Sequence, residues 1–274
     1  MPECARDFPW LGGLMAVCLL CSTAALGQPR ADLVTLSVRD AVTQTYLLVA
    51  DPAVPVEQVV VLLSGGAGNV RLRPASLRPE FAERGNFLVR TRYLWAEGGF
   101  AAVVVDAPSD RAELGMDDVF RSGSTHAEDL GKVIVDLRQR FPKAAVTLVG
   151  TSRGTVSAAS IARQLPGRFE RVVLTASVFN ASRAGAGLAG FDYASIKAPL
   201  LFVHHVDDGC QQTPYSGAKR LATIYPLISV SGGWPAESGP CDPLAAHGFF
   251  GKEAETVEAM KNWIRGRSFA TQIQ

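Results

Sequence analysis

The chain has 274 residues, of which 47% are hydrophobic and 19% are charged. This length and composition are typical of one globular domain with a large core, and they exclude a disordered or fibrous protein. The net charge is +1 and Lys and Arg form no long run, so the sequence also excludes the basic surface of a nucleic-acid-binding protein.

The N-terminal 27 residues predict a cleaved export signal. Arg6 precedes an apolar run at 11–26 that is too short for a comfortable membrane span, and the run ends in the small-residue pattern Ala25-Leu26-Gly27. Two acidic residues offset Arg6, so an uncleaved membrane anchor is the alternative. We expect the mature protein, residues 28–274, to be periplasmic or secreted, with no stable membrane insertion after cleavage.

Strands and helices alternate along the rest of the chain. Two β-branched and aromatic segments predict an opening antiparallel hairpin, and later continuous apolar segments predict strands buried on both faces. The apolar spacing of residues 130, 133, 134 and 137 predicts one buried helical face. The predicted strands are 33–38, 43–50, 59–64, 100–108, 144–149, 171–176, 199–206 and 226–232. The predicted helices are 86–97, 126–140, 155–165, 213–223 and 252–265. This order predicts an α/β fold with a mostly parallel sheet and helices on both faces.

Two irregular stretches interrupt this pattern, at 109–125 and 178–195. They are long enough to shape the mouth of a pocket but too short for a lid domain, so we expect them to determine the pocket's shape. We expect several aromatic side chains to contribute as well: Phe179, Phe191, Tyr193, Tyr215 and Trp234.

The most informative motif is Gly150-Thr151-Ser152-Arg153-Gly154, which lies between a predicted strand and a predicted helix. This setting is typical of a tight turn that exposes a nucleophilic serine in a strained backbone conformation. Glycines two positions before and after the serine remove side chains that would collide with the neighbouring strand and helix. Ser152 is therefore the candidate nucleophile.

A serine nucleophile requires a base and an orienting carboxylate. His247 lies in a loop just before the last predicted helix and is the candidate base. Asp207 and Asp208 follow the strand at 199–206, at the carboxyl end where sites in open α/β sheets form, and either could be the acid. His204 and His205 end the same strand and are expected to be packing residues.

The order Ser152, Asp208, His247, together with the strand–turn–helix context, resembles the α/β-hydrolase family over residues 34–263. The resemblance implies that Ser152 is the nucleophile, Asp208 rather than Asp207 the acid, and His247 the base. It also places an oxyanion loop at 64–68, with backbone donors from Gly65 or Gly66 and from Arg153. The chain departs from the family at Ser64, where many lipases and esterases have histidine.

Removal of the signal leaves two of the five cysteines, Cys210 and Cys241, in an oxidising compartment. We expect them to form a disulfide that closes a loop of about 30 residues. The alternative is two buried free thiols. Because Cys210 lies two residues after Asp208 and Cys241 six before His247, the bridge would tie the acid loop to the histidine loop.

The sequence thus predicts an exported serine hydrolase that cleaves a carboxylic ester in a small-molecule acyl substrate. A peptidase or thioesterase with the same triad is a neighbouring possibility. A catalytically silent binding protein for a hydrophobic small molecule is the alternative from another class. No histidine pair has the spacing of a zinc site on a helix, so neither a metal nor a cofactor is expected. The sequence does not indicate an oligomeric state.

Overall fold

The computed structural model describes residues 29–74 and 83–274. The predicted export signal and its three cysteines lie outside the described residues, so the signal remains a prediction. Within the described ranges, no helix is both long and apolar enough to span a bilayer.

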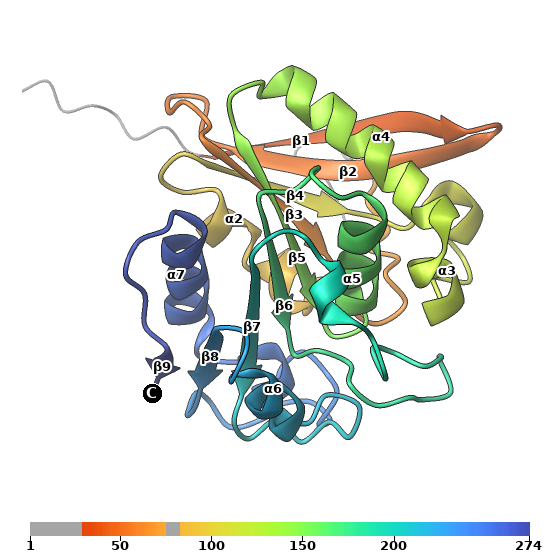
Figure 1. Cartoon of the computed structure of the whole chain (residues 1–274). Coiled ribbons are helices and arrows are strands. Elements are labelled where there is room, and N and C mark those ends of the chain that lie inside the picture. The colour runs from red at the N-terminus through yellow and green to blue at the C-terminus, as the bar shows by residue number, and fades with distance from the viewer. Residues whose placement is uncertain (1–28, 75–82) are drawn as a thin grey trace, which may run out of the picture.

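One nine-stranded sheet organises the described chain, with strand order β1-β2-β4-β3-β5-β6-β7-β8-β9 (Figure 1). β1 pairs antiparallel with β2, β2 pairs antiparallel with β4, and all later neighbours are parallel. The strands are β1 (Arg30–Arg39), β2 (Val42–Ala50), β3 (Gln58–Leu63), β4 (Phe100–Val105), β5 (Ala145–Thr151), β6 (Arg171–Thr175), β7 (Leu200–His205), β8 (Leu227–Val230) and β9 (Gln272–Ile273). The predicted mostly parallel sheet with an antiparallel N-terminal hairpin is confirmed.

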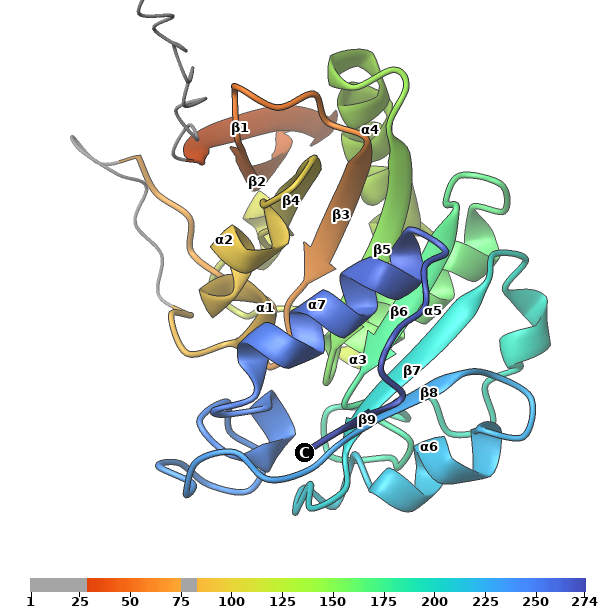
Figure 2. The same ribbon diagram turned by 90° about the vertical axis from the view of Figure 1, so that its left-hand side faces the viewer.

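Helices cover both faces of this sheet. The helices are α1 (Phe87–Arg90), α2 (Arg92–Trp95), α3 (Asp118–Ser122), α4 (Ser124–Arg140), α5 (Gly154–Gln164), α6 (Tyr215–Leu221) and α7 (Glu253–Ile264). One core joins α4, α5 and α6 to the sheet, and a second core on the other face joins α1, α2 and α7 to it. Figure 2 shows α7 and α2 across the second face. The central strands contribute side chains to both cores, which explains their continuous apolar sequences.

The elements differ from the sequence-based prediction in three places. The helix predicted at 86–97 is divided into α1 and α2, because the hydroxyl of Thr91 donates to the carbonyl of Phe87 and Thr91 leaves the helical conformation. The irregular stretch 109–125 contains the short helix α3 and the start of α4. β9 was not predicted, because two residues at the chain's end are too few to show a period.

Candidate active site

Ser152 occupies the sharp turn between β5 and α5, with a φ of 51° that few non-glycine residues adopt. A β-carbon at Gly150 would lie 2.4 Å from the carbonyl oxygen of Gly154, and one at Gly154 would lie 2.0 Å from the carbonyl oxygen of Leu63. Both contacts are with backbone atoms, which cannot rotate away. The strained turn predicted from the glycine spacing is therefore present.

The loop 64–68 follows β3 and lies directly against this turn. A β-carbon at Gly65 would be 2.9 Å from the β-carbon of Ser152, so only glycine permits this approach. Among the described residues, the backbone N–H groups of Gly65, Gly66 and Arg153 donate no hydrogen bond to another protein group. Gly65 is buried and Arg153 half-buried, where N–H groups are normally paired, and Gly66 is exposed. These three N–H groups are therefore available to a ligand.

Asp208 and His247 are brought together from the loop after β7 and from a short turn of 3-10 helix at Ala246–Gly248. The Nδ1 atom of His247 lies 3.0 Å from Oδ2 of Asp208, whose side chain is fully buried. The backbone N–H of Cys210 donates to the other carboxylate oxygen at 3.0 Å. Asp207 is exposed, and its backbone N–H donates to His205. Of the two candidate acids, the structure places only Asp208 beside His247.

Thr213 is a member of this site that the sequence did not indicate. Its hydroxyl donates to Oδ2 of Asp208 at 2.8 Å and lies 3.1 Å from Nδ1 of His247. The shared carboxylate oxygen accepts from both partners, so the hydrogen of the imidazole belongs on Nδ1. This tautomer leaves Nε2 of His247 free to accept a proton.

Ser152 and His247 line the same pocket, which has a volume of about 260 Å³. Other lining residues come from the loop 64–68, from the N-terminal end of α1 and from residues 241–248: Gly65, Gly66, Glu83, Asn86, Phe87, Thr151, Cys241, Asp242, Pro243 and Gly248. No hydrogen bond joins the Ser152 hydroxyl to His247 in the structure. Catalytic hydrogen bonds of this kind often tighten only when substrate binds.

The lining of this pocket corrects one sequence-based expectation. Neither of the irregular stretches 109–125 and 178–195 contributes to it. Phe179, Phe191 and Tyr193 instead line a separate pocket of about 180 Å³ beside α6. Tyr215 is hydrogen bonded to Ser229. Trp234 is 65% exposed, and its ring contacts that of Phe250. Side chains from non-adjacent segments determine the pocket, so loop length alone could not identify them.

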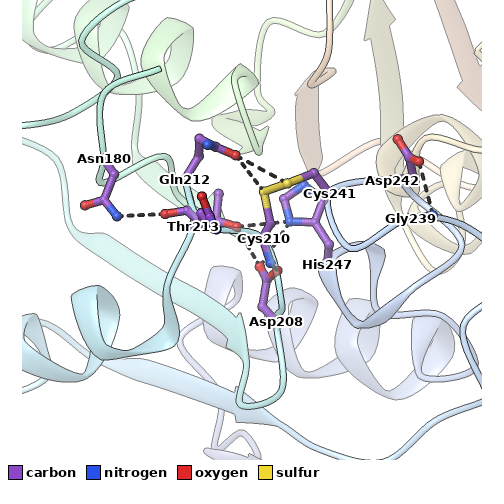
Figure 3. Close-up of a disulfide and its surroundings, with 10 residues drawn as sticks. Asn180, Asp208, Cys210, Gln212, Thr213, Gly239, Cys241, Asp242 and His247 are labelled. Carbon is purple, nitrogen blue, oxygen red and sulfur yellow. Dashed lines mark hydrogen bonds and ion pairs between the residues drawn. A yellow bond between two sulfur atoms is a disulfide. The ribbon is translucent and has the colours of Figure 1, made fainter. Parts of the chain in front are cut away.

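Cys210 and Cys241 form the predicted disulfide, which joins the loop carrying Asp208 to the loop carrying His247 (Figure 3). Cys241 also lines the pocket of Ser152. The side-chain oxygen of Gln212 lies 3.2 and 3.3 Å from the two sulfurs. The disulfide is thus part of the wall of the site.

The two histidines that end β7 have structural surroundings, as expected. His204 is fully buried, and its Nε2 accepts the backbone N–H of Ser177 at 2.7 Å. Burial lowers the pKa of His204 to about 3, so it is neutral at pH 7. His205 accepts the backbone N–H of Asp207 and contacts the carbonyl of Gly232. Throughout the described ranges, no group of three or more His, Cys, Asp or Glu side chains is arranged to hold a metal ion.

Comparison with known proteins identifies solved structures of the same fold at low sequence identity. No family model and no curated protein matches the chain. Among solved structures, a dienelactone hydrolase from Anabaena variabilis is 15% identical with a TM-score of 0.57, covering 87% of this chain and 96% of its own. A Xanthomonas campestris α/β serine hydrolase described as having no lid is 16% identical with a TM-score of 0.56, covering 86% and 94%. A cold-adapted esterase from an Arctic intertidal metagenomic library is 14% identical with a TM-score of 0.51, covering 75% and 86%. This likeness confirms the α/β-hydrolase fold.

Proposed function

We propose that this α/β-hydrolase-fold chain is an exported serine hydrolase that cleaves a carboxylic ester through Ser152, His247 and Asp208. The observation that carries the proposal is the shared pocket: a serine on a strained, glycine-flanked turn lines it together with an imidazole held by a buried carboxylate. Esterases and serine hydrolases among the structural neighbours support the same chemistry, although at their low identity they establish the fold alone.

In this proposal His247 Nε2 takes the proton of the Ser152 hydroxyl as the oxygen attacks the acyl carbon. Asp208 keeps the imidazole hydrogen on Nδ1 and stabilises the imidazolium that forms. His247 then donates its proton to the leaving alcohol, and water hydrolyses the acyl-enzyme by the reverse sequence of proton transfers. Thr213 orients Asp208 through its hydroxyl.

The negative oxygen of the tetrahedral intermediate would be held by the unpaired backbone N–H groups of Arg153 and of Gly65 or Gly66. Their positions beside Ser152 support this role, because the contact of Gly65 with the serine places the loop 64–68 next to the reacting atom. Ser64 replaces the histidine of many family members, but it contributes no backbone donor in this assignment, so the substitution is compatible with it.

An exported location is supported by the disulfide, since such bonds persist in oxidising compartments. The apolar N-terminal segment predicts export by a signal peptide, with residues 1–27 removed and residues 28–274 retained. Sequencing the N-terminus of the exported protein distinguishes this cleaved form from a retained anchor.

The size and charge of the pocket favour small substrates that carry no negative charge. At about 260 Å³ it is smaller than most sites for drug-sized ligands. Two carboxylates, Glu83 and Asp242, line it, and its described lining contains no Lys or Arg. An acyl group with its own carboxylate would be repelled there, so we propose short neutral or cationic esters as substrates.

The test is labelling of the purified protein with a fluorophosphonate, followed by assays with short neutral, cationic and anionic acyl esters. We expect the wild type to be labelled and to hydrolyse the first two classes, whereas Ser152→Ala loses both properties and remains folded. Ser37→Ala, an exposed serine on β1, is the matched control and should behave as wild type.

The other possible results assign other functions. A folded wild type that is not labelled contradicts the hydrolase proposal and favours the silent binding protein. Labelling with turnover of amides or thioesters, but not of oxygen esters, retains the triad and replaces the substrate class.

A further inference from the structure

A fully buried arginine without an ion-pair partner lies beneath the loop 64–68. Arg121, in the last turn of α3, is 0% exposed. Its guanidinium donates to the carbonyl of Gly66 at 3.2 Å, to the carbonyl of Met116 at 3.2 Å and to the hydroxyl of Ser157 at 2.9 Å. No carboxylate of the described chain lies within ion-pair distance of it.

A second guanidinium binds the same two carbonyl groups. Arg153, the residue after the proposed nucleophile, donates to Gly66 at 3.2 Å and to Met116 at 3.1 Å, and it pairs with Asp118 at 3.0 Å. The carbonyl of Gly66 is therefore held from two sides. The loop is tied further by the backbone N–H of Met116, which donates to the carbonyl of Ala67 at 2.8 Å.

The loop 64–68 packs closely against the guanidinium of Arg121. A β-carbon at Gly68 would lie 2.5 Å from the guanidinium nitrogen Nη2 of Arg121. Ser157 lies on α5, the helix that begins at the nucleophile turn, and its hydroxyl is also 3.0 Å from Nε2 of the buried His126. Arg121 thus connects the loop 64–68, α3 and α5 through hydrogen bonds rather than through apolar contacts.

Burial of an unpaired cation is costly, and well-packed apolar side chains usually replace such groups without loss of stability. An arginine kept in this position therefore points to a requirement other than packing. The carbonyl of Gly66 belongs to the rigid, planar peptide unit that joins Gly66 to Ala67. Holding this unit from two sides restrains the α-carbon of Gly66 and, through it, the preceding peptide unit, which carries the N–H of Gly66. The carbonyl of Gly65 in that preceding unit accepts from the N–H of Gly68 at 3.0 Å, which restrains it further.

We propose that Arg121 is a positioning residue of the oxyanion site: with Arg153 it holds the Gly66 carbonyl and thereby directs the loop's N–H groups toward the intermediate formed at Ser152. The buried positive charge adds to the stabilisation of the oxyanion, because electrostatic interactions are strong where water is excluded. This inference rests on the proposed function of Ser152, and no step of the reaction requires Arg121 to touch the substrate.

The test measures turnover per labelled active site. The active sites of Arg121→Met and Arg121→Lys are titrated with fluorophosphonate, and kcat and KM are then measured for each variant. We also measure the Ki of phenylboronic acid, which forms a negatively charged tetrahedral adduct with serine. We expect Arg121→Met to lower kcat about 10- to 100-fold with little change in KM, and to raise the Ki by a similar factor. Arg121→Lys keeps the positive charge but loses the forked geometry of the guanidinium, so its kcat and Ki should lie between those of wild type and Arg121→Met.

A structural role alone would lower the melting temperature and the labelled fraction but leave turnover per labelled site unchanged, which would overturn the inference. Arg138→Ala, at an exposed ion pair with Glu170, is the control and should match wild type. If Arg121→Met does not fold, Arg121→Lys and Ser157→Ala decide: both should lose turnover per site, and wild-type values in both would overturn the inference.

The two proposals can fail separately. If the wild type is not labelled, or if Ser152→Ala retains turnover, the hydrolase proposal fails and the role of Arg121 fails with it. If the wild type is labelled and the Arg121 variants keep its turnover per site and its boronate affinity, only the role of Arg121 is wrong.

Discussion

Gly154 is required by contact with backbone atoms rather than by flexibility, because a β-carbon there would meet the carbonyl oxygen of Leu63 at 2.0 Å. We expect Gly154→Ala to lower the free energy of unfolding by about 3 kcal/mol, since neither β3 nor α5 can move without disturbing the core. The measurement is urea unfolding followed by circular dichroism.

The matched control is a glycine in the long helix α4. A β-carbon at Gly131 would lie 3.7 Å from a methyl group of Leu165, an ordinary contact. Gly131→Ala should therefore stabilise the protein, by about 0.5–1 kcal/mol, through the lower conformational entropy of alanine in the unfolded chain. Equal effects of the two substitutions would show that the close approach at Gly154 is not what determines its identity.

Thr213 gives a second prediction at the level of single residues. Thr213→Val keeps the shape of the side chain but removes the hydroxyl that donates to Asp208. A hydrogen bond to a charged group contributes about 1.5–3 kcal/mol, so we expect kcat to fall about tenfold or more, whereas Thr213→Ser should stay close to wild type. Steady-state assays normalised to labelled sites check this. A wild-type kcat in folded Thr213→Val would exclude a role in orienting Asp208.

The disulfide between Cys210 and Cys241 acts at the level of two loops, since it spans 31 residues and joins the segments that carry Asp208 and His247. For this length the chain-entropy model gives a stabilisation of about 3–4 kcal/mol. We expect the Cys210→Ser, Cys241→Ser variant to unfold at lower urea concentration. It should also lose activity below its unfolding transition, because catalysis tolerates displacements of only about 0.5 Å.

Dithiothreitol provides the internal control for this prediction. Cys241 is exposed, so reductant can reach the bridge. The wild type should lose stability and activity on reduction, whereas the serine variant should be insensitive to the reagent. If reduction changes neither property of the wild type, the bridge does not position the two loops.

Local features were predictable from the sequence, whereas features that depend on tertiary contact were not. Continuous β-branched segments identify the central strands, and the glycine spacing around Ser152 identifies the turn, because both signals lie within a few adjacent residues. Neighbours such as Asp207 and Asp208 cannot be distinguished by composition, since a difference of one position reverses which side chain is buried. Thr213 begins a segment that was expected to be a helix, and Arg121 lies in a helix that was not expected, so neither residue stands out in the sequence. Their importance depends on Asp208, Gly66 and other partners distant in the chain.

All four histidines of the chain are buried, and two of them, His126 in α4 and His204 in β7, have a lowered pKa. Burial lowers the pKa of His204 to about 3, and burial together with the nearby Arg121 charge lowers that of His126 to about 3. In the unfolded chain both bind a proton near the ordinary value of 6.5. Between about pH 6.5 and 3 the unfolded state therefore holds more protons than the folded state, so stability is fully present above 6.5 and is lost as the pH falls.

Each of these histidines should lower the free energy of unfolding by up to about 2 kcal/mol at pH 5, because one pH unit corresponds to about 1.4 kcal/mol for one proton. Urea unfolding at pH 7.5, 6 and 5 measures the slope for the wild type, for His126→Asn and for His204→Asn. Each variant removes one titrating group, so its free energy of unfolding should depend less on pH than that of wild type, even where its stability at pH 7.5 is lower. Parallel curves for all three proteins would show that both imidazoles take up protons in the folded state as readily as in water. The acid sensitivity of the fold would then have to arise from its carboxylates.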